Sequence, residues 1–129
     1  MCVLDKNVES TGELAIRVVA MPADTNPSGD IFGGWLLSQM DLAGSVVAKK
    51  IAKSKVVTIA INDMVFKSPV FVGDTLCCYV DVVKVGRTSI TVNIESWVNR
   101  ELSEGKRFKV TEGVFTYVKV DENNKPSVI

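Results

Sequence analysis

The chain has 129 residues, of which 47% are hydrophobic and 23% charged, the proportions of one globular domain with a buried core. Its 15 basic and 15 acidic residues cancel, so no net field favours a nucleic acid or an anionic membrane as partner, and we expect neither. The chain contains no histidine, which excludes Ser-His-Asp and Cys-His relays and leaves acid–base chemistry to carboxylates.

The N-terminal part of the chain predicts one strand followed by a long loop. Residues 12–21 alternate between apolar and polar side chains, as a half-buried strand does, and Pro22 ends the run. Residues 22–30 then hold two prolines and a glycine among small polar side chains, which is typical of a loop. Loops of this length in a small domain are often functional.

The segment from Gly33 to about Lys53 has the apolar period of a helix. A stripe roughly 120° wide is expected to face the core. Its members are Leu36, Leu37, Met40, Gly44, Val47, Ala48 and Ile51. A second apolar patch, formed by Trp35, Leu42 and Val46, lies on another side of the helix, so we expect this side to meet a second subunit or a ligand.

The rest of the chain predicts strands and no second helix. Four strand-like runs span residues 55–66, 74–85, 88–100 and 106–120. The third run alternates most clearly, which predicts an antiparallel sheet with one dry face. We therefore expect an α+β fold in which a curved antiparallel sheet, with its strands in a meander after the helix, wraps that helix.

The predicted boundaries leave one domain over residues 1–129, with frayed tails at 1–11 and 121–129. A sheet of this kind has edges with unpaired backbone groups. Pairing two sheets edge to edge in a homodimer would cover them and would also occupy the spare apolar patch of the helix.

The start of the helix and its middle carry the candidate chemistry. Gly33 and Gly34 stand where the first-turn amides have no partner in the helix, so these donors and the helix dipole can stabilise an oxyanion. Asp41 lies about 10 Å further along, too far to act with the donors of its own helix. Two subunits could therefore each supply half of one site. The alternative is that Asp41 bonds Ser38 or Ser45 and that the glycines only allow close packing.

Three further places carry candidate polar groups. Asn26, in the loop, could orient water or polarise a carbonyl through its amide, and an Asx-turn that only shapes the loop explains it equally well. Arg87 could grip a phosphate with help from Thr88 or Ser89, unless this turn is only a solvated hairpin tip. Lys67 has the same two interpretations.

The cysteines and the N-terminus bear on location. Cys2, Cys77 and Cys78 cannot all pair, have no zinc-type spacing and are expected to pack as small apolar residues, which suits a reducing compartment. The chain has no apolar run of membrane-spanning length, and its start lacks the features of a signal peptide. We expect a cytoplasmic protein that uses no metal.

Four stretches resemble a known family. They are "MPADTNPSGDIFGGWLLSQMDLAG", "VVTIAINDMVFKSPVFVGDTLCCYV", "VGRTSITVNIESWV" and "TEGVFTYVKVD", which together cover nearly the whole chain. They resemble hotdog-fold acyl-CoA thioesterases of the bacterial YciA type, related to the animal acyl-CoA hydrolases. The resemblance implies a long helix wrapped by a five-stranded antiparallel sheet, dimers with a continuous sheet, and a trimer of dimers, hence a homohexamer.

The same resemblance implies a reaction and its residues. Acyl-CoA would be hydrolysed to a free fatty acid and CoA without a cofactor. The catalytic acidic residue of the family falls on Asp41, which would act as general base for water or as nucleophile. The loop asparagine falls on Asn26, and the oxyanion glycine on Gly34, with Gly33 beside it.

For the substrate, the resemblance points to CoA contacts at Arg87, Thr88 and Ser89, with Lys67 as a further candidate. Trp35 and Met40 could line an acyl channel, although core packing explains both equally well. A non-catalytic acyl-CoA sensor or scaffold is the alternative function, because hotdog domains also serve as ligand-binding modules. The intact catalytic motif favours the enzyme.

Overall fold

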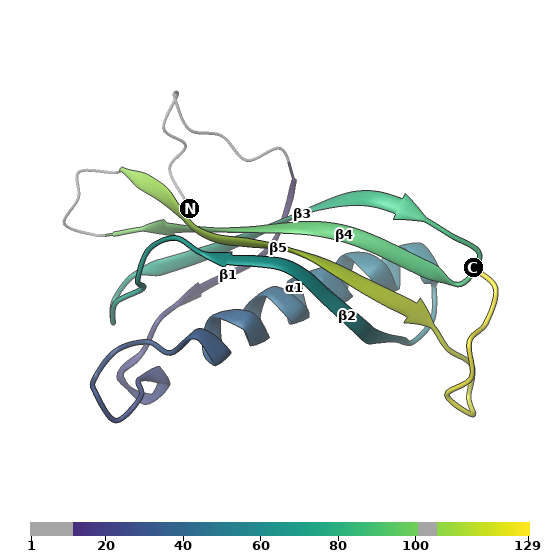
Figure 1. The fold of residues 1–129 in the computed structure, drawn as a ribbon, viewed down its shortest axis with the longest axis horizontal. Helices are drawn as coiled ribbons and strands as arrows, with labels where there is room; N and C mark the ends of the chain where they lie inside the picture. The colour runs from purple at the N-terminus through teal and green to yellow at the C-terminus, as the bar shows by residue number, and fades with distance from the viewer. Residues whose placement is uncertain (1–11, 101–105) are drawn as a thin grey trace.

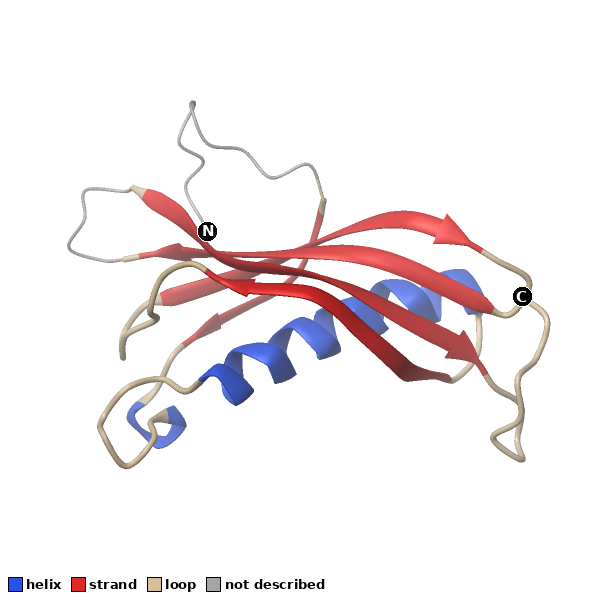
Figure 2. Cartoon of the chain, in the orientation of Figure 1, coloured by secondary structure: helices blue, strands red, loops and turns tan. Residues whose placement is uncertain are grey.

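The computed structural model describes residues 12–100 and 106–129, and it contains one long helix that lies along one face of a five-stranded antiparallel sheet (Figure 1). The strands and helices are β1 (Glu13–Val19), the 3-10 helix η1 (Pro22–Asp24), α1 (Gly33–Ala52), β2 (Val56–Phe66), β3 (Thr75–Val85), β4 (Ser89–Asn99) and β5 (Arg107–Lys119). The predicted α+β fold is confirmed, and the bounds of the long elements agree with the sequence to within two residues. Figure 2 shows that α1 covers only one face of the sheet.

The strand order is β1-β3-β4-β5-β2. Strands β3, β4 and β5 form the expected meander, but β2 pairs with β5 and not with β3, so the meander prediction is wrong for β2. The connection 67–74 therefore carries the chain from one edge of the sheet back toward β1. Because β2 pairs only with β5 among the described strands, its other edge is open.

The core lies between α1 and the sheet face that it covers. Five residues of the predicted stripe are buried, and the other two, Leu37 and Ile51, are half-buried. Trp35 is only 9% exposed and belongs to the same core, so its assignment to the second patch is wrong. A long side chain leans toward the N-terminal end of its helix, which a fixed step of 100° ignores. Leu42 and Val46 are exposed, as expected of that patch.

The connection before β3 is held by an ion pair between a buried carboxylate and a half-buried guanidinium. Asp74 is 1% exposed, and its carboxylate accepts hydrogen bonds from Arg100 Nε (2.9 Å) and Nη2 (3.0 Å) and from the Phe71 amide (2.8 Å). The guanidinium lies 4.6 Å from the centre of the Phe71 ring. The Asp74 carbonyl also accepts the Ala20 amide at 2.9 Å. These bonds fix the connection to the end of β1 and to β4.

The C-terminal segment 121–129 is not frayed. Asp121 Oδ1 accepts the amides of Asn123 (2.8 Å) and Lys125 (3.0 Å), so the chain turns back on itself. The Ile129 amide then donates to the Arg87 carbonyl at 2.9 Å. The expectation of a frayed tail is therefore wrong here, because an Asx-turn supplies bonds that composition alone does not show. The other expected tail, 1–11, lies outside the described residues.

The cysteines of β3 differ from each other. Burial raises the pKa of the Cys78 thiol to about 11, and its sulfur lies 3.4 Å from Ser96 Oγ, which fits the expectation of a small buried residue. Cys77 is buried and disulfide-bonded, which the sequence did not indicate. Neither of the helices in the described part of the chain is long and apolar enough to cross a membrane.

We predict that Asp74→Ala lowers the free energy of unfolding by about 2–4 kcal/mol, because it removes the acceptor of a charged, half-buried guanidinium and of a backbone amide. Urea denaturation measures the change. The matched control is Glu13→Ala, which breaks the exposed pair with Lys50 and should change stability by less than about 1 kcal/mol. Equal effects of the two variants would contradict this assignment.

Candidate active site

The Asp41 carboxylate lies where α1 meets β2 and β5, and one of its oxygens is held by both strands. Asp41 Oδ1 accepts hydrogen bonds from Thr58 Oγ1 at 2.7 Å and from the Tyr117 hydroxyl at 3.1 Å. The Tyr117 hydroxyl also lies 2.8 Å from the Asp41 carbonyl oxygen. Both of these hydrogen bonds end on Oδ1, and none among the described residues ends on Oδ2. Oδ2 is therefore the oxygen that is available for chemistry.

The proposed serine partners of Asp41 are wrong. Ser38 Oγ donates to the Trp35 carbonyl at 2.7 Å, and Ser45 Oγ donates to the Leu42 carbonyl at 2.8 Å. Both hydroxyls therefore bond to the helix backbone, a common alternative for serine within helices. The partners of Asp41 come from distant strands instead, and no local spacing in the sequence indicates them.

Tyr117 is the part of this site that sequence analysis missed. Its side chain is fully buried, and burial, the negative charge of Asp41 and the hydrogen bond to that carboxylate all raise the pKa of the hydroxyl. Tyr117 therefore keeps its proton and remains a donor. The one signal in the sequence is Gly44, a residue without a side chain in the middle of the core stripe, because a gap there has to be filled from the sheet.

The start of α1 offers main-chain donors. Phe32 caps the helix without a side-chain hydrogen bond, and the first turn contains no acidic residue. Gly33 and Gly34 are exposed, and a Cβ on Gly34 would lie 3.1 Å from the Phe32 ring. The amides of this turn are thus accessible to an anionic group, and the helix dipole favours one there.

A pocket of about 400 Å³ lies beside this helix start. It is lined by Ile31, Phe32, Gly33, Leu36, Phe66, Lys67, Ser68, Pro69 and Val70. Its walls are mostly apolar and its one cation is Lys67, whose Nζ pairs with Glu112 at 3.1 Å. The structure therefore brings the CoA-contact candidate Lys67 and the oxyanion candidate Gly33 to one pocket, a relation that the sequence did not indicate.

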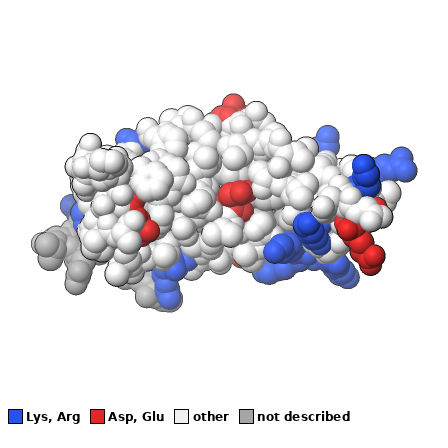
Figure 3. Space-filling view, turned by 90° about the horizontal axis from the view of Figure 1, so that it is seen from below, with Lys and Arg blue, Asp and Glu red and all other residues white. Residues whose placement is uncertain are grey.

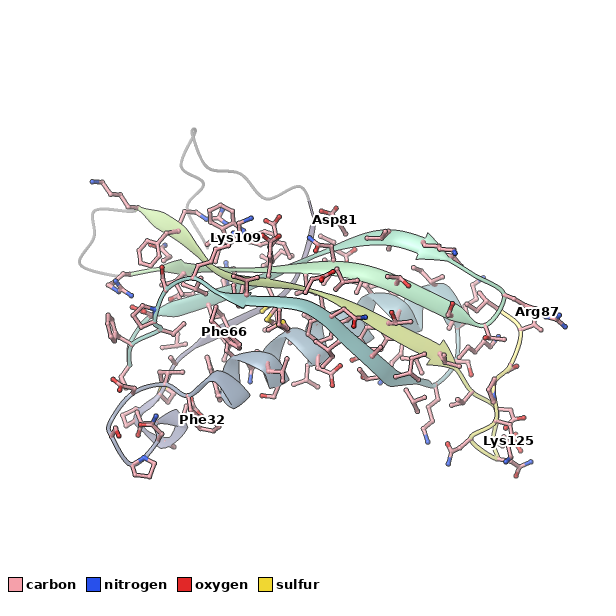
Figure 4. The ribbon with its side chains drawn as sticks, in the orientation of Figure 1. Phe32, Phe66, Asp81, Arg87, Lys109 and Lys125 are labelled. Carbon is pink, nitrogen blue, oxygen red and sulfur yellow. The ribbon has the colours of Figure 1, made fainter. Side chains whose placement is uncertain are left out.

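The predicted phosphate-binding turn lies elsewhere. Arg87 is at the opposite end of the molecule from Phe32 and Phe66 (Figure 4). Arg87 is exposed, while the Thr88 and Ser89 carbonyls accept the amides of Lys119 and Gly86, as in an ordinary hairpin turn. Within one subunit these residues do not meet the pocket.

Asn26 forms the Asx-turn that was one of its two interpretations. Its Oδ1 accepts hydrogen bonds from the main-chain amides of Ser28 (2.9 Å) and Asp30 (3.1 Å). The main-chain amide of Asn26 donates to the Asp30 carbonyl at 2.7 Å. The carbonyl end of the side chain is therefore occupied by the loop. The NH₂ end is the one that can donate to a substrate or water.

The acyl-channel prediction for Trp35 and Met40 is not supported by their placement. Met40 is fully buried and Trp35 is nearly so, and both belong to the hydrophobic core between α1 and the sheet. Neither lines the pocket at the helix start, whose apolar walls come from Phe32, Leu36 and Phe66. Core packing is the interpretation that fits these two residues.

The face that carries α1 is largely uncharged, with a group of basic side chains toward the end where α1 finishes (Figure 3). Within residues 12–100 and 106–129, no group of three or more histidine, cysteine, aspartate or glutamate side chains could hold a metal ion.

Known proteins with similar sequences show the family to which this chain belongs. The model of the thioesterase superfamily matches residues 28–102. The acyl-CoA thioester hydrolase YciA of Salmonella typhimurium is 56% identical over 117 residues, which cover 89% of this chain and 88% of that protein.

Solved structures agree with the sequence matches. A hexameric thioesterase from Yersinia pestis has a TM-score of 0.90 at 52% identity, covering 94% of this chain and 98% of that one. A hexameric broad-specificity acyl-coenzyme A thioesterase, crystallised as an aspartate-to-alanine mutant enzyme, has a TM-score of 0.88 at 50% identity and covers 92% of this chain and 87% of its own.

Proposed function

Because this chain belongs to the thioesterase superfamily and is a hotdog-fold acyl-CoA thioester hydrolase, we propose that Asp41 and the start of α1 carry its reaction, each from a different subunit. The observation that carries the proposal is the asymmetric bonding of Asp41. Oδ1 accepts from Thr58 and Tyr117, while Oδ2 is left for chemistry. The aspartate-to-alanine mutant of the similar enzyme adds support for an acidic residue.

The need for two subunits follows from the helix. Gly34 and Asp41 are about 10 Å apart along one axis, so they cannot act on the same carbonyl group. The open edge of β2 offers a way to join two chains, because antiparallel pairing of two β2 strands would satisfy both edges. Exposed apolar side chains surround this edge. They are Leu42, Val46, Ile59, Ile61, Val65 and Phe66.

A two-fold axis at β2 also explains the separated substrate residues. Two α1 helices related by such an axis are antiparallel, so the first turn of one helix, with Gly34, lies beside the middle of the other, with Asp41. It also brings the Arg87 turn of one subunit toward the pocket end of its partner. Arg87, Thr88 and Ser89 would then bind CoA phosphates together with Lys67 of the other chain.

The chemistry needs a base and a place for negative charge. Asp41 Oδ2 accepts a proton from water as the water oxygen attacks the thioester carbonyl. The resulting oxyanion accepts hydrogen bonds from the Gly34 amide, with Gly33 beside it. Collapse of this intermediate breaks the C–S bond, and the CoA thiolate takes up the proton that Asp41 Oδ2 accepted, which restores the carboxylate. In the alternative route Asp41 attacks the carbonyl itself, and water then hydrolyses the mixed anhydride. Apart from water and acyl-CoA, both routes use only groups of the two subunits, and we propose no cofactor.

The assembly is also part of the proposal. The similar thioesterases are hexamers, and we place the catalytic unit in a dimer and three dimers in the hexamer. Light scattering of the purified protein measures this stoichiometry. A cytoplasmic location completes the proposal, and cell fractionation measures it.

We predict that Asp41→Asn keeps the fold and reduces acyl-CoA hydrolysis by about a thousandfold, because the amide can still accept from Thr58 and Tyr117 but cannot take a proton. A thiol reagent follows CoA release across a panel of acyl chain lengths. Glu122→Gln, an exposed carboxylate in the C-terminal turn, is the control and should keep full activity. Undiminished turnover in Asp41→Asn would refute the proposed role of this residue.

The shared site predicts complementation between two inactive variants. Gly34→Pro removes the amide donor at a position in the first turn where proline is tolerated. When Asp41→Asn and Gly34→Pro chains are mixed, unfolded and refolded together, each mixed dimer contains one site with both groups intact. We expect recovery of about a quarter of the wild-type activity. A mixture no more active than its two components would place the groups within one subunit.

The loop asparagine yields a third prediction. Asn26→Asp can keep the Asx-turn, because a carboxylate accepts the same two amides, but it loses the NH₂ donor. If that donor binds the substrate carbonyl or the water, Asn26→Asp and Asn26→Ala should both lose about a hundredfold in kcat. Retention of activity in Asn26→Asp, with loss only in Asn26→Ala, would show that the loop geometry alone matters.

A further inference from the structure

The Tyr117 hydroxyl reaches Asp41 from inside the core, and the hydroxyl itself takes no part in the proton transfer or the oxyanion contacts described above. From it we propose that Tyr117 is a positioning residue for hydrolysis, which fixes Asp41 Oδ1 so that Oδ2 faces the thioester, and that Gly44 is glycine because this contact requires it. The proposal rests on the proposed role of Asp41 as the reacting carboxylate.

The first support is the way in which the hydroxyl is bonded. It lies 2.8 Å from the Asp41 carbonyl oxygen and 3.1 Å from Oδ1, so its one hydrogen is directed between two acceptors of the same residue. The bond to the backbone ties the tyrosine to α1, and the bond to the side chain sets the orientation of the carboxylate. Thr58 donates to the same oxygen at 2.7 Å. Two donors on Oδ1 define the plane of the carboxylate and leave Oδ2 outside their reach.

The second support is the rigidity of the tyrosine. Tyr117 is fully buried, and its ring lies 6.5 Å from that of Phe115 with an interplanar angle of 14°. A close-packed side chain of this size has one orientation available. Its hydroxyl is the donor in both bonds because burial and the neighbouring Asp41 charge raise its pKa. The Asp41 carboxylate is thus held by a donor, Tyr117, whose side chain is fixed by its packing in the core.

The third support is Gly44, one helical turn after Asp41. A Cβ at this position would lie 2.8 Å from Tyr117 Cζ and 2.8 Å from Ile94 Cδ1, and closer still to the Tyr117 hydroxyl oxygen. Any side chain here would push the tyrosine away from Asp41 or lift α1 from the sheet. The glycine therefore provides the space in which the hydroxyl crosses from β5 to α1.

These contacts predict a specific kinetic result. Tyr117→Phe removes one oxygen atom and leaves the packed ring, so the hexamer should persist. We expect kcat to fall about tenfold to a hundredfold while KM for acyl-CoA changes by less than about threefold, because substrate binding is intact and the base is misplaced. Tyr79→Phe is the matched control, since Tyr79 is buried with Cys77 and Trp97 in a separate cluster and should keep full kcat. A wild-type kcat in Tyr117→Phe would overturn the proposal.

Coupling to Asp41 separates positioning from a general loss of stability. If Tyr117 acts through Asp41, Tyr117→Phe should reduce the residual activity of Asp41→Asn by no more than about twofold. Independent, multiplying losses would overturn the proposal. Full activity in Asp41→Asn would instead refute the proposed function itself, so the two failures are distinguishable.

If Tyr117→Phe fails to assemble, the contact between Tyr117 and Asp41 can be tested by NMR with the tyrosine intact. The chain has only two tyrosines, so tyrosine labelled with ¹³C at Cζ gives two resonances, and Tyr79→Phe assigns them. We expect the Tyr117 resonance to differ between the wild-type protein and Asp41→Ala, which removes the Oδ1 acceptor, and the Tyr79 resonance to stay in place. An unchanged Tyr117 resonance would show that the two groups are not bonded and would overturn the proposal.

Discussion

A carboxylate at the junction of a helix and a sheet needs hydrogen-bond donors, and this requirement organises the region around Asp41. Taking a charged group partly out of water is unfavourable unless its oxygens are bonded. Here the donors come from two neighbouring strands, Thr58 on β2 and Tyr117 on β5. The pairing of β2 with β5 places these two donors side by side, next to the turn of α1 that carries Asp41.

Under the proposed mechanism, this arrangement calls for a second subunit. The donors around Asp41 bond its carboxylate but offer nothing to an oxyanion, and the main-chain amides suited to that task are at the start of the same helix. A straight helix cannot bring its first turn to its own middle. The strand that supplies Thr58 is also an edge strand of the sheet, so the edge at which we propose that a second chain pairs lies next to Asp41. Under the proposed pairing, the same strand both supports the carboxylate and brings in the missing donors.

The sequence predicted the long elements well, because each has a clear period of its own. Strands 88–100 and 106–120 alternate, and α1 carries a regular apolar stripe. What it could not predict are relations between distant segments. The neighbour of β2 is chosen by the crossing connection, which Asp74 and Arg100 hold, and periodicity contains no information on pairing. The residue pattern alone made Asp41, Gly34 and Asn26 candidates, and the family resemblance added their roles. Thr58 and Tyr117 became visible only when the strands were placed beside the helix.

The glycines of α1 illustrate how chemistry and packing share one helix. Glycine within a helix is unfavourable by about 1 kcal/mol relative to alanine, so three of them in α1 would weaken it in isolation. Two stand at the exposed first turn, where small size leaves the amides open. The third, Gly44, is buried and admits the Tyr117 hydroxyl. The stability of α1 therefore has to come from the buried stripe on either side of Gly44. The base that we propose is a carboxylate, and holding a carboxylate at the edge of a core requires both a donor and the space for it. Gly44 and Tyr117 supply these two needs together, so a change in one has to be matched by a change in the other.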